Sequence, residues 1–225
     1  CQIVIDCSSS MLFPGKDKFN KLHFSVHAAA SLIELLKKQR DAVGLTLFTD
    51  KIDLHTKAKS SVRHHRFLYS ELEKNLKLHH KSETNKSSTI QSIHDIAELS
   101  HKRSLIIIFS DLLDDPENLD EFLRALQHLK HNKHEVILFH TIDKNIEQDF
   151  ELENRPYQFI DMETGEKLKL QPQQIREKYK EEIGKYFKDI ELRCADYSID
   201  FMPADINAGY DSILLNYLLK RQKLH

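Results

Sequence analysis

Oxygen-bearing side chains crowd the loop after the first apolar run of the sequence. The stretch IVIDCSSSM places Asp6, Ser8 and Ser10 at alternate positions, so a single loop can turn all three side chains towards one point. Carboxylate and hydroxyl oxygens are hard ligands that suit Mg²⁺ or Mn²⁺, whereas zinc sites favour His and Cys. The spacing therefore predicts part of a divalent-cation site.

Two more oxygen ligands follow later in the chain. Thr89 precedes a helical pattern of apolar residues, and Asp111 follows the strand-like run Leu105–Phe109. In an open parallel sheet, the loops at the carboxyl ends of the strands converge at one edge, beside helix N-termini. Each residue alone has a structural explanation as a helix cap or a turn residue. Their joint placement on three loops favours one shared site.

The charge of this set bears on what it binds. Two carboxylates and three neutral hydroxyls leave a divalent ion incompletely neutralised, above all if one carboxylate acts through water. Mg²⁺ in proteins usually keeps several waters, so an open position remains at which a carboxylate from another molecule can bind. We therefore expect the site to bind an acidic ligand.

The remaining sequence predicts the elements that would position these side chains. Strand-like runs alternate with helix-like periodic segments, which indicates an α/β fold with a mostly parallel central sheet flanked by helices. Strands are expected at Gln2–Ile5, Val43–Phe48, Leu105–Phe109 and Glu135–His140, with an antiparallel edge strand around Ile52–His55. Helices are expected over 22–36, over 67–78, from a cap at Ser88 or Thr89, and from Pro116 to about His131.

The last third of the chain has a different character. It predicts a hairpin of Tyr157–Asp161 and Lys167–Leu170 with Gly165 in the turn, a long charged helix over 172–194, a short strand Ser198–Met202 and a last helix over 210–221. We expect one domain over residues 1–225, with its core at about 1–145 and a hairpin and helix elaboration at about 146–225. Because the chain starts at Cys1, directly on a strand, we expect a fragment that lacks an N-terminal region.

Composition and hydropathy bear on the partner and the location of the chain. Charged residues make up 30% of the chain and nearly cancel to a net charge of −2, so no basic excess indicates a nucleic-acid partner. The three cysteines form no CxxC pair, which favours a reducing compartment and a cytoplasmic location. No apolar run approaches the ~20 residues of a membrane span.

Other chemistries find less support. The 14 histidines form no HExxH motif, and His128, His131 and His134 near a helix end are expected to be packing or solvated residues. The chain has no GxSxG, P-loop or GxGxxG motif. The main rival is a Mg²⁺-dependent phosphohydrolase of the haloacid dehalogenase type. Its first loop needs a second aspartate as general acid where this chain has Ser8, and a hydroxyl cannot protonate a leaving group.

The same residues carry a family resemblance. DCSSS is similar to the DxSxS signature of the metal-ion-dependent adhesion site (MIDAS) of von Willebrand factor A domains. The chain resembles most closely a bacterial branch of A-like domains of unknown function that are associated with MoxR-type AAA+ ATPases. The stretches that carry this resemblance are IDCSSSMLFPGKDKFNKLHFSVHAAASLIELL, DAVGLTLF, SSTI, RSLIIIFSDLLDD, HEVILFHTID, FIDMETGEKLKL and LLNYLLKRQ.

This resemblance implies a von Willebrand factor A-like fold with Asp6, Ser8 and Ser10 as first-loop ligands, Thr89 as the second-loop ligand and Asp111 as the third-loop ligand of Mg²⁺ or Mn²⁺. Ser9 stands where the family often has glycine. The implied function is a non-enzymatic, metal-dependent protein-interaction module, with a MoxR-type ATPase as possible partner in complex assembly. A phosphohydrolase, and an A-like domain with an empty metal site, remain as alternatives.

Overall fold

The computed structural model describes residues 1–15, 18–77, 87–112, 119–160, 165–211, 213, 215, 217 and 218, with the side chains of residues 87–89 outside the description. A six-stranded sheet forms its centre, in the order β3-β2-β1-β4-β5-β8. The strands are β1 (Gln2–Asp6), β2 (Gly44–Phe48), β3 (Ile52–His55), β4 (Leu105–Ser110), β5 (Glu135–Ile142) and β8 (Asp200–Asp205). All neighbouring pairs are parallel except β2 with β3. The predicted α/β fold with an antiparallel edge strand is confirmed.

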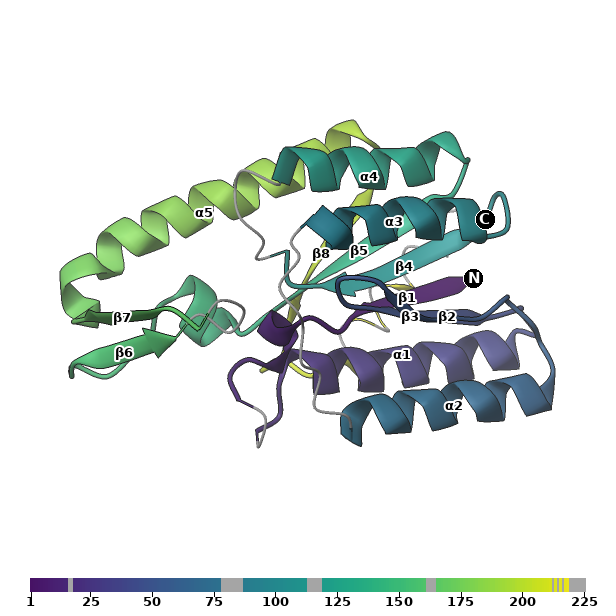
Figure 1. Ribbon diagram of the computed structural model, residues 1–225, viewed down its shortest axis with the longest axis horizontal. Helices are drawn as coiled ribbons and strands as arrows, with labels where there is room; N and C mark the ends of the chain where they lie inside the picture. The colour runs from purple at the N-terminus through teal and green to yellow at the C-terminus, as the bar shows by residue number, and fades with distance from the viewer. Residues whose placement is uncertain are drawn as a thin grey trace.

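Helices cover both faces of this sheet (Figure 1). On one face lie α1 (Lys21–Lys38) and α2 (Val62–Lys77), and on the other lie α3 (Ser87–Leu99), α4 (Leu119–His131) and α5 (Pro172–Asp196). Alternate residues of the strands point to opposite faces. Along β4, Ile107 and Phe109 join the core under α1, whereas Ile106 and Ile108 join the core under α3 and α4. This double burial explains why the strands read as continuous apolar runs.

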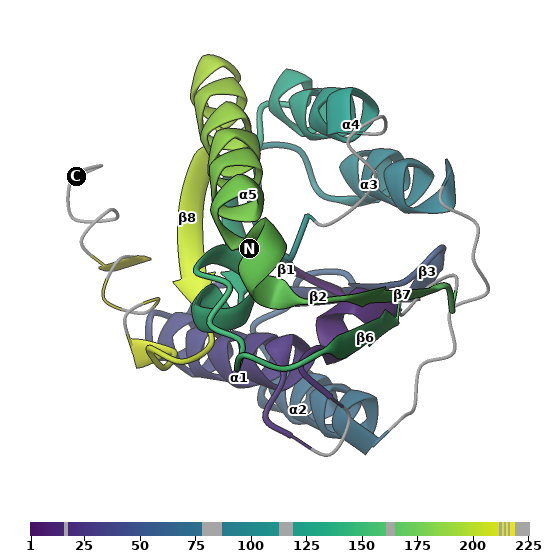
Figure 2. The ribbon, with the colours of Figure 1, turned by 90° about the vertical axis from the view of Figure 1, so that its left-hand side faces the viewer.

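A smaller antiparallel hairpin stands apart from the central sheet. Its strands β6 (Tyr157–Ile160) and β7 (Lys167–Leu170) pair only with each other within the described chain, and Gly165 before β7 has a positive φ of 74°. The hairpin follows a π-helical turn, Lys144–Gln148, and precedes α5. Figures 1 and 2 place it at the end of the molecule towards which β1 runs. The expected hairpin is thus present over its described residues.

Two helix starts differ from the expected positions. The second helix begins at Val62 rather than Phe67, because the side chain of Ser61 accepts a hydrogen bond from the backbone N–H of His64 (3.3 Å) and caps an earlier turn. The third helix begins at Ser87, so Ser88 and Thr89 lie within its first turn instead of capping it. The predicted helix start at Pro116, part of the hairpin turn and most of the end of the last helix lie outside the described residues.

Gly44 is required by a close approach of the chain at the start of β2. A Cβ atom at this position would lie 2.5 Å from the carbonyl oxygen of Thr56 and even closer to the side chain of Gln2. We expect Gly44→Ala to lower the free energy of unfolding by about 1–3 kcal/mol, because backbone must shift. Gly184→Ala is the matched control, since Gly184 lies within α5 with nothing near its missing Cβ, and there we expect stabilisation by about 0.5–1 kcal/mol. Chemical denaturation measures both, and equal effects of the two substitutions would contradict the prediction.

His134 makes stability depend on pH. Its side chain is buried, Nδ1 accepts a hydrogen bond from the N–H of Ser104 (3.1 Å), and burial lowers the pKa of the ring from its usual 6.5. The folded protein therefore takes up a proton on His134 less readily than the unfolded chain, so the stability from neutral His134 is lost as pH falls below about 6.5. In His134→Asn the amide oxygen can accept the same hydrogen bond without titrating. We expect thermal melts of this variant to lose less Tm than the wild type between neutral pH and pH 5.5, and a parallel loss in both proteins would refute the assignment.

Candidate metal centre

The first predicted ligands meet at the carboxyl end of β1. Asp6 is the last residue of this central strand and is only 4% exposed. Its Oδ1 accepts the backbone N–H of Ser8 (2.9 Å), and the hydroxyl oxygens of Ser8 and Ser10 lie 3.0 Å apart. The loop therefore gathers one carboxylate and two hydroxyls, as the alternate spacing predicts.

Asp111 joins this group from the neighbouring strand. It directly follows β4, is 3% exposed, and lies close enough for its charge to act on Asp6. The backbone carbonyl of Asp111 accepts a hydrogen bond from Nε2 of His140 (2.9 Å). Burial lowers the pKa of His140 to about 4, so this ring is a neutral donor that fixes the loop. Parallel pairing of β1 with β4 thus brings two predicted ligands together.

The electrostatics of this edge favour a cation. Burial, and next the negative charge of Asp111, raise the pKa of Asp6 to about 7. The donor set consists of oxygen atoms, which suits Mg²⁺ or Mn²⁺. In the described part of the chain, no group of three or more His, Cys, Asp or Glu side chains could hold a metal ion. A site here would thus rest on two carboxylates completed by hydroxyls, and these residues fit such an ion in chemistry.

Thr89 completes the predicted set only in its backbone position. It lies in the first turn of α3, and its side chain is outside the described residues. The structure therefore brings Asp6, Ser8, Ser10 and Asp111 to one edge and leaves the Thr89 side chain as a prediction.

Ser110 contacts a predicted ligand, Asp6, and sequence reasoning missed it. Its hydroxyl donates to Oδ2 of Asp6 (2.7 Å) and accepts the N–H of Leu112 (3.3 Å). Ser110 lies between the apolar run Leu105–Phe109 and Asp111, and no local motif or spacing singles it out as a partner of Asp6. It holds the Asp6 carboxylate from the adjacent strand.

Lys21 is a second residue absent from the predicted set. It is the first residue of α1 and is completely buried, and its Nζ lies 2.6 Å from Oδ2 of Asp111 and 2.7 Å from Oε1 of Glu147. Burial alone would lower the pKa of Lys21, but the two carboxylates outweigh it and raise this pKa. A lysine at the positive end of a helix dipole is unfavourable, and that signal could have indicated a specific partner.

Glu147 connects this ion pair to the segment after β5. Its Oε2 accepts the N–H of Asp143 (2.7 Å), and its backbone carbonyl accepts the hydroxyl of Tyr179 from α5 (2.8 Å). Burial raises the pKa of Glu147, against the opposing charge of Lys21. The elaboration is therefore fastened to the residues around Asp111.

Cys7 has the character of a packing residue. Its side chain is fully buried, its sulfur accepts a hydrogen bond from Nδ2 of Asn75 (3.3 Å), and burial raises the pKa of the thiol. A thiol held in its protonated form is a poor nucleophile.

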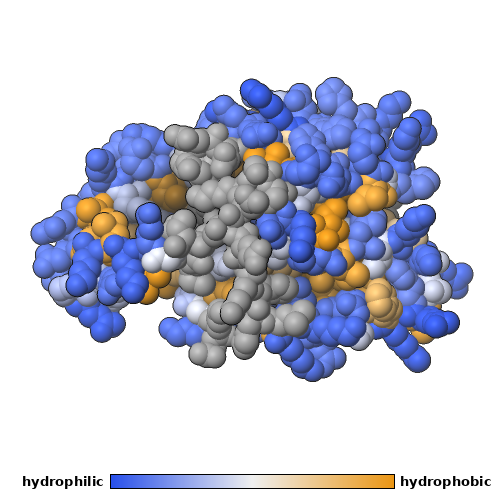
Figure 3. Space-filling view, viewed as in Figure 1, coloured by the Kyte–Doolittle hydropathy of each residue, from blue (hydrophilic) through white to orange (hydrophobic). Residues whose placement is uncertain are grey.

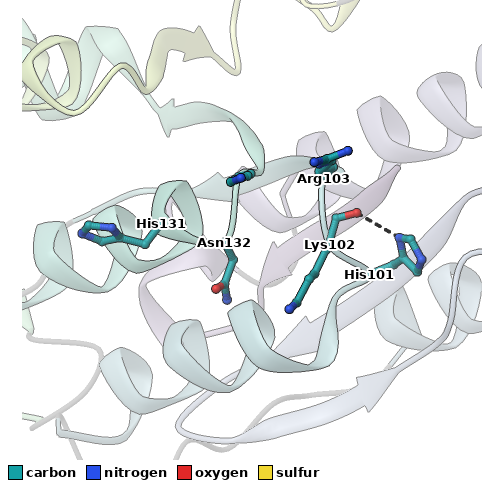
Figure 4. A pocket seen from close by; sticks show the side chains of 6 residues that line it. His101, Lys102, Arg103, His131 and Asn132 are labelled. Carbon is teal, nitrogen blue, oxygen red and sulfur yellow. Dashed lines mark hydrogen bonds between the residues drawn. The ribbon is translucent and has the colours of Figure 1, made fainter.

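A hollow at the opposite, amino-terminal edge of the sheet has basic walls (Figure 4). It measures about 560 Å³ and is lined by His101, Lys102, Arg103, His131, Asn132 and Lys133. His131 is the last residue of α4, and the other residues follow the C-terminal ends of α3 and α4, where cations interact favourably with helix dipoles. Nδ2 of Asn132 donates to the carbonyl of Ala97 (3.0 Å), which ties one loop to the other helix. We therefore expect the basic members of this cluster to stabilise the ends of α3 and α4.

In the described residues, no helix is both long enough and apolar enough to cross a membrane.

The hydrogen bond from Ser110 to Asp6 should be measurable in stability. Ser110→Ala removes a donor from a buried carboxylate, and we expect the free energy of unfolding to fall by about 1.5–3 kcal/mol at neutral pH. Ser100→Ala is the control, because the Ser100 hydroxyl is buried without a hydrogen-bond partner in the structure. Urea denaturation that gave the same loss for both alanines would show that the Asp6 contact contributes nothing.

Comparisons with known proteins show where the chain belongs. It is similar to a crystal structure of the conserved hypothetical protein BatB from Bacteroides thetaiotaomicron, at 15% identity and a TM-score of 0.54, over 94% of this chain and 93% of that one. It also matches an aerotolerance-related membrane protein from Bacteroides fragilis, at 13% identity and a TM-score of 0.49, over 94% and 98% of the two chains. No curated protein matches. The family described as "Protein of unknown function DUF58" matches residues 1–186, and the chain therefore belongs to the DUF58 family.

Proposed function

We propose that this chain is a non-enzymatic, metal-dependent protein-interaction module of the von Willebrand factor A type. One observation carries the proposal: two buried carboxylates, Asp6 and Asp111, meet beside the paired hydroxyls of Ser8 and Ser10 at the carboxyl edge of a parallel sheet. Ligands in this class of sheet bind at that edge. The set resembles a MIDAS in residue types and in the loops that supply them.

In this proposal Asp6, Ser8, Ser10, Thr89 and Asp111 would hold Mg²⁺ or Mn²⁺. The bound ion would supply a positive charge that attracts a carboxylate from a partner protein. The protein's own residues keep the site in place: Ser110 holds Asp6, His140 holds the backbone of Asp111, and Lys21 holds its side chain.

The hairpin supports an interaction role. Ile160 and Leu168 are 56% and 62% exposed, although large apolar side chains gain by burial. Figure 3 shows apolar side chains gathered among hydrophilic ones at the end of the molecule where the hairpin and the start of α5 lie. The hairpin lies at the end of the molecule towards which β1 runs (Figure 1), and Asp6 is the last residue of β1. A partner could thus contact both.

The family resemblance suggests which partner to test first. A MoxR-type AAA+ ATPase with an exposed acidic residue would fit the proposed site, and the chain would then act as an adaptor in complex assembly. A cytoplasmic location belongs to the same proposal.

The rival enzyme is disfavoured by the chemistry of the first loop. A phosphohydrolase of the haloacid dehalogenase type needs a carboxylic acid two residues after Asp6, and Ser8 occupies that position with its hydroxyl beside Ser10. A serine hydroxyl is far too weak an acid to protonate a leaving alkoxide efficiently. The Ser8 position therefore favours binding over catalysis.

We expect the wild type to bind Mg²⁺ and Mn²⁺. Asp6→Ala should weaken the binding of both ions by more than about 100-fold, because replacing a residue that only supports a ligand already costs up to about 100-fold and Asp6 is a proposed ligand itself. Isothermal titration calorimetry measures this directly. Asp196→Ala, which removes an exposed aspartate at the end of α5, should leave binding unchanged. Absence of binding in the wild type would favour an A-like domain with an empty site.

Two further measurements separate function from metal binding. Proteins that the immobilised wild type retains from an extract in Mg²⁺ should be released by a chelator and should not be retained by Asp6→Ala. Metal-dependent turnover of a generic phosphoester, abolished by Asp6→Ala, would overturn the proposal in favour of a phosphohydrolase.

A further inference from the structure

Lys21 places a cation inside the proposed metal centre. Its side chain has no solvent exposure, and its ammonium bridges Oδ2 of Asp111 at 2.6 Å and Oε1 of Glu147 at 2.7 Å. The ring of Phe13 lies 5.6 Å from Nζ and closes over the group. A buried ammonium of this kind acts on its neighbours with little screening by solvent.

The two carboxylates that Lys21 joins are not equivalent. Asp111 belongs to the proposed ligand set, whereas both oxygens of Glu147 are engaged elsewhere, Oε1 by Lys21 and Oε2 by the N–H of Asp143. Lys21 and Glu147 together add no net charge. Their positions are nevertheless asymmetric. The ammonium of Lys21 contacts Asp111, whereas the carboxylate of Glu147 lies on the far side of Lys21.

We propose that Lys21 tunes the oxygen site by drawing on the Asp111 carboxylate, and that Glu147 sets the strength of this effect by drawing on Lys21 from the other side. This inference rests on the proposed function, because it concerns the ion that the site would hold. An ammonium on Asp111 leaves less negative charge for the ion. The ion then stays incompletely neutralised, which is the condition for attracting a carboxylate from a partner.

Opposite effects of the two partners distinguish tuning from a purely structural role. Lys21→Met removes a positive charge beside the ion and should strengthen Mg²⁺ binding by about tenfold or more. Glu147→Gln removes the negative charge that draws Lys21 away from Asp111. Lys21 then acts more strongly on Asp111, so Mg²⁺ binding should weaken by about tenfold or more. If Lys21 and Glu147 merely oriented the metal ligands, replacing either one should lower the Mg²⁺ affinity of the site by about 10–100-fold.

In the double variant Lys21→Met/Glu147→Gln, Glu147 no longer has the ammonium through which it acts, so the Mg²⁺ affinity should stay above that of the wild type, as in Lys21→Met; the effects of two residues in contact are not expected to add. The double variant also keeps the test valid if one single variant folds poorly, because replacing both members of a buried ion pair often preserves stability. The exposed pair Lys37–Glu34 on the same helix is the matched control, with Nζ 2.9 Å from Oε2. Lys37→Met and Glu34→Gln should leave the affinity unchanged.

Calorimetric titration of Mg²⁺ into each folded variant, with circular dichroism to check the fold, gives the answer. Weaker binding in both Lys21→Met and Glu147→Gln would overturn the inference and leave the proposed function intact. If the wild type binds no Mg²⁺, the result contradicts the proposed metal-dependent function. The inference then survives only if Lys21→Met acquires binding, and it is refuted if that variant also binds none.

Discussion

Two carboxylates of like charge lie buried together at the ends of neighbouring parallel strands. Burying them costs free energy, and the surrounding residues offset part of this cost. The pairing of β1 with β4 puts Asp6 and Asp111 at the same edge of the sheet. Buried charges are unfavourable unless they are paired and hydrogen-bonded. The hydroxyl of Ser110, the N–H of Ser8 and the ammonium of Lys21 provide those partners. These partners offset part of the cost of burying the two carboxylates, and the pKa of Asp6, raised to about 7, shows that a part of the cost remains.

The same requirement links the elaboration to the core. Glu147 pairs with Lys21 and receives the hydroxyl of Tyr179 from α5 on its carbonyl. The Tyr179 ring contacts Phe150 at 4.4 Å between centroids, and Phe150 stacks on Phe159 of the hairpin at 6.2 Å. A two-stranded hairpin is marginally stable alone, so these ring contacts help to hold it. The last third of the chain is thus attached to the proposed oxygen ligands through a continuous series of buried and half-buried contacts.

The fold was largely predictable because strands buried on both faces give near-continuous apolar runs, as in LIIIFS of β4. The first loop was predictable because its spacing is local. Ser110 and Glu147 were not, since the contacts that give them a role join residues 104 and 126 positions apart, and no local pattern encodes such a distance. The early start of α2 was missed for a smaller reason, a single serine cap at Ser61 among polar neighbours.

The central position of β1 has a consequence for the order of folding. This strand is the first in the chain, yet its two neighbours are β2 and β4, so one of its edges stays unpaired until a segment about a hundred residues later is available. Contacts of such long sequence separation form slowly, because the intervening chain must close first. Until β4 pairs with β1, the Asp6 carboxylate lacks the hydrogen bond that Ser110 donates in the folded protein. The proposed oxygen ligands come together only when β1 and β4 are paired, so we expect them to assemble late in folding and to depend on the integrity of the whole core.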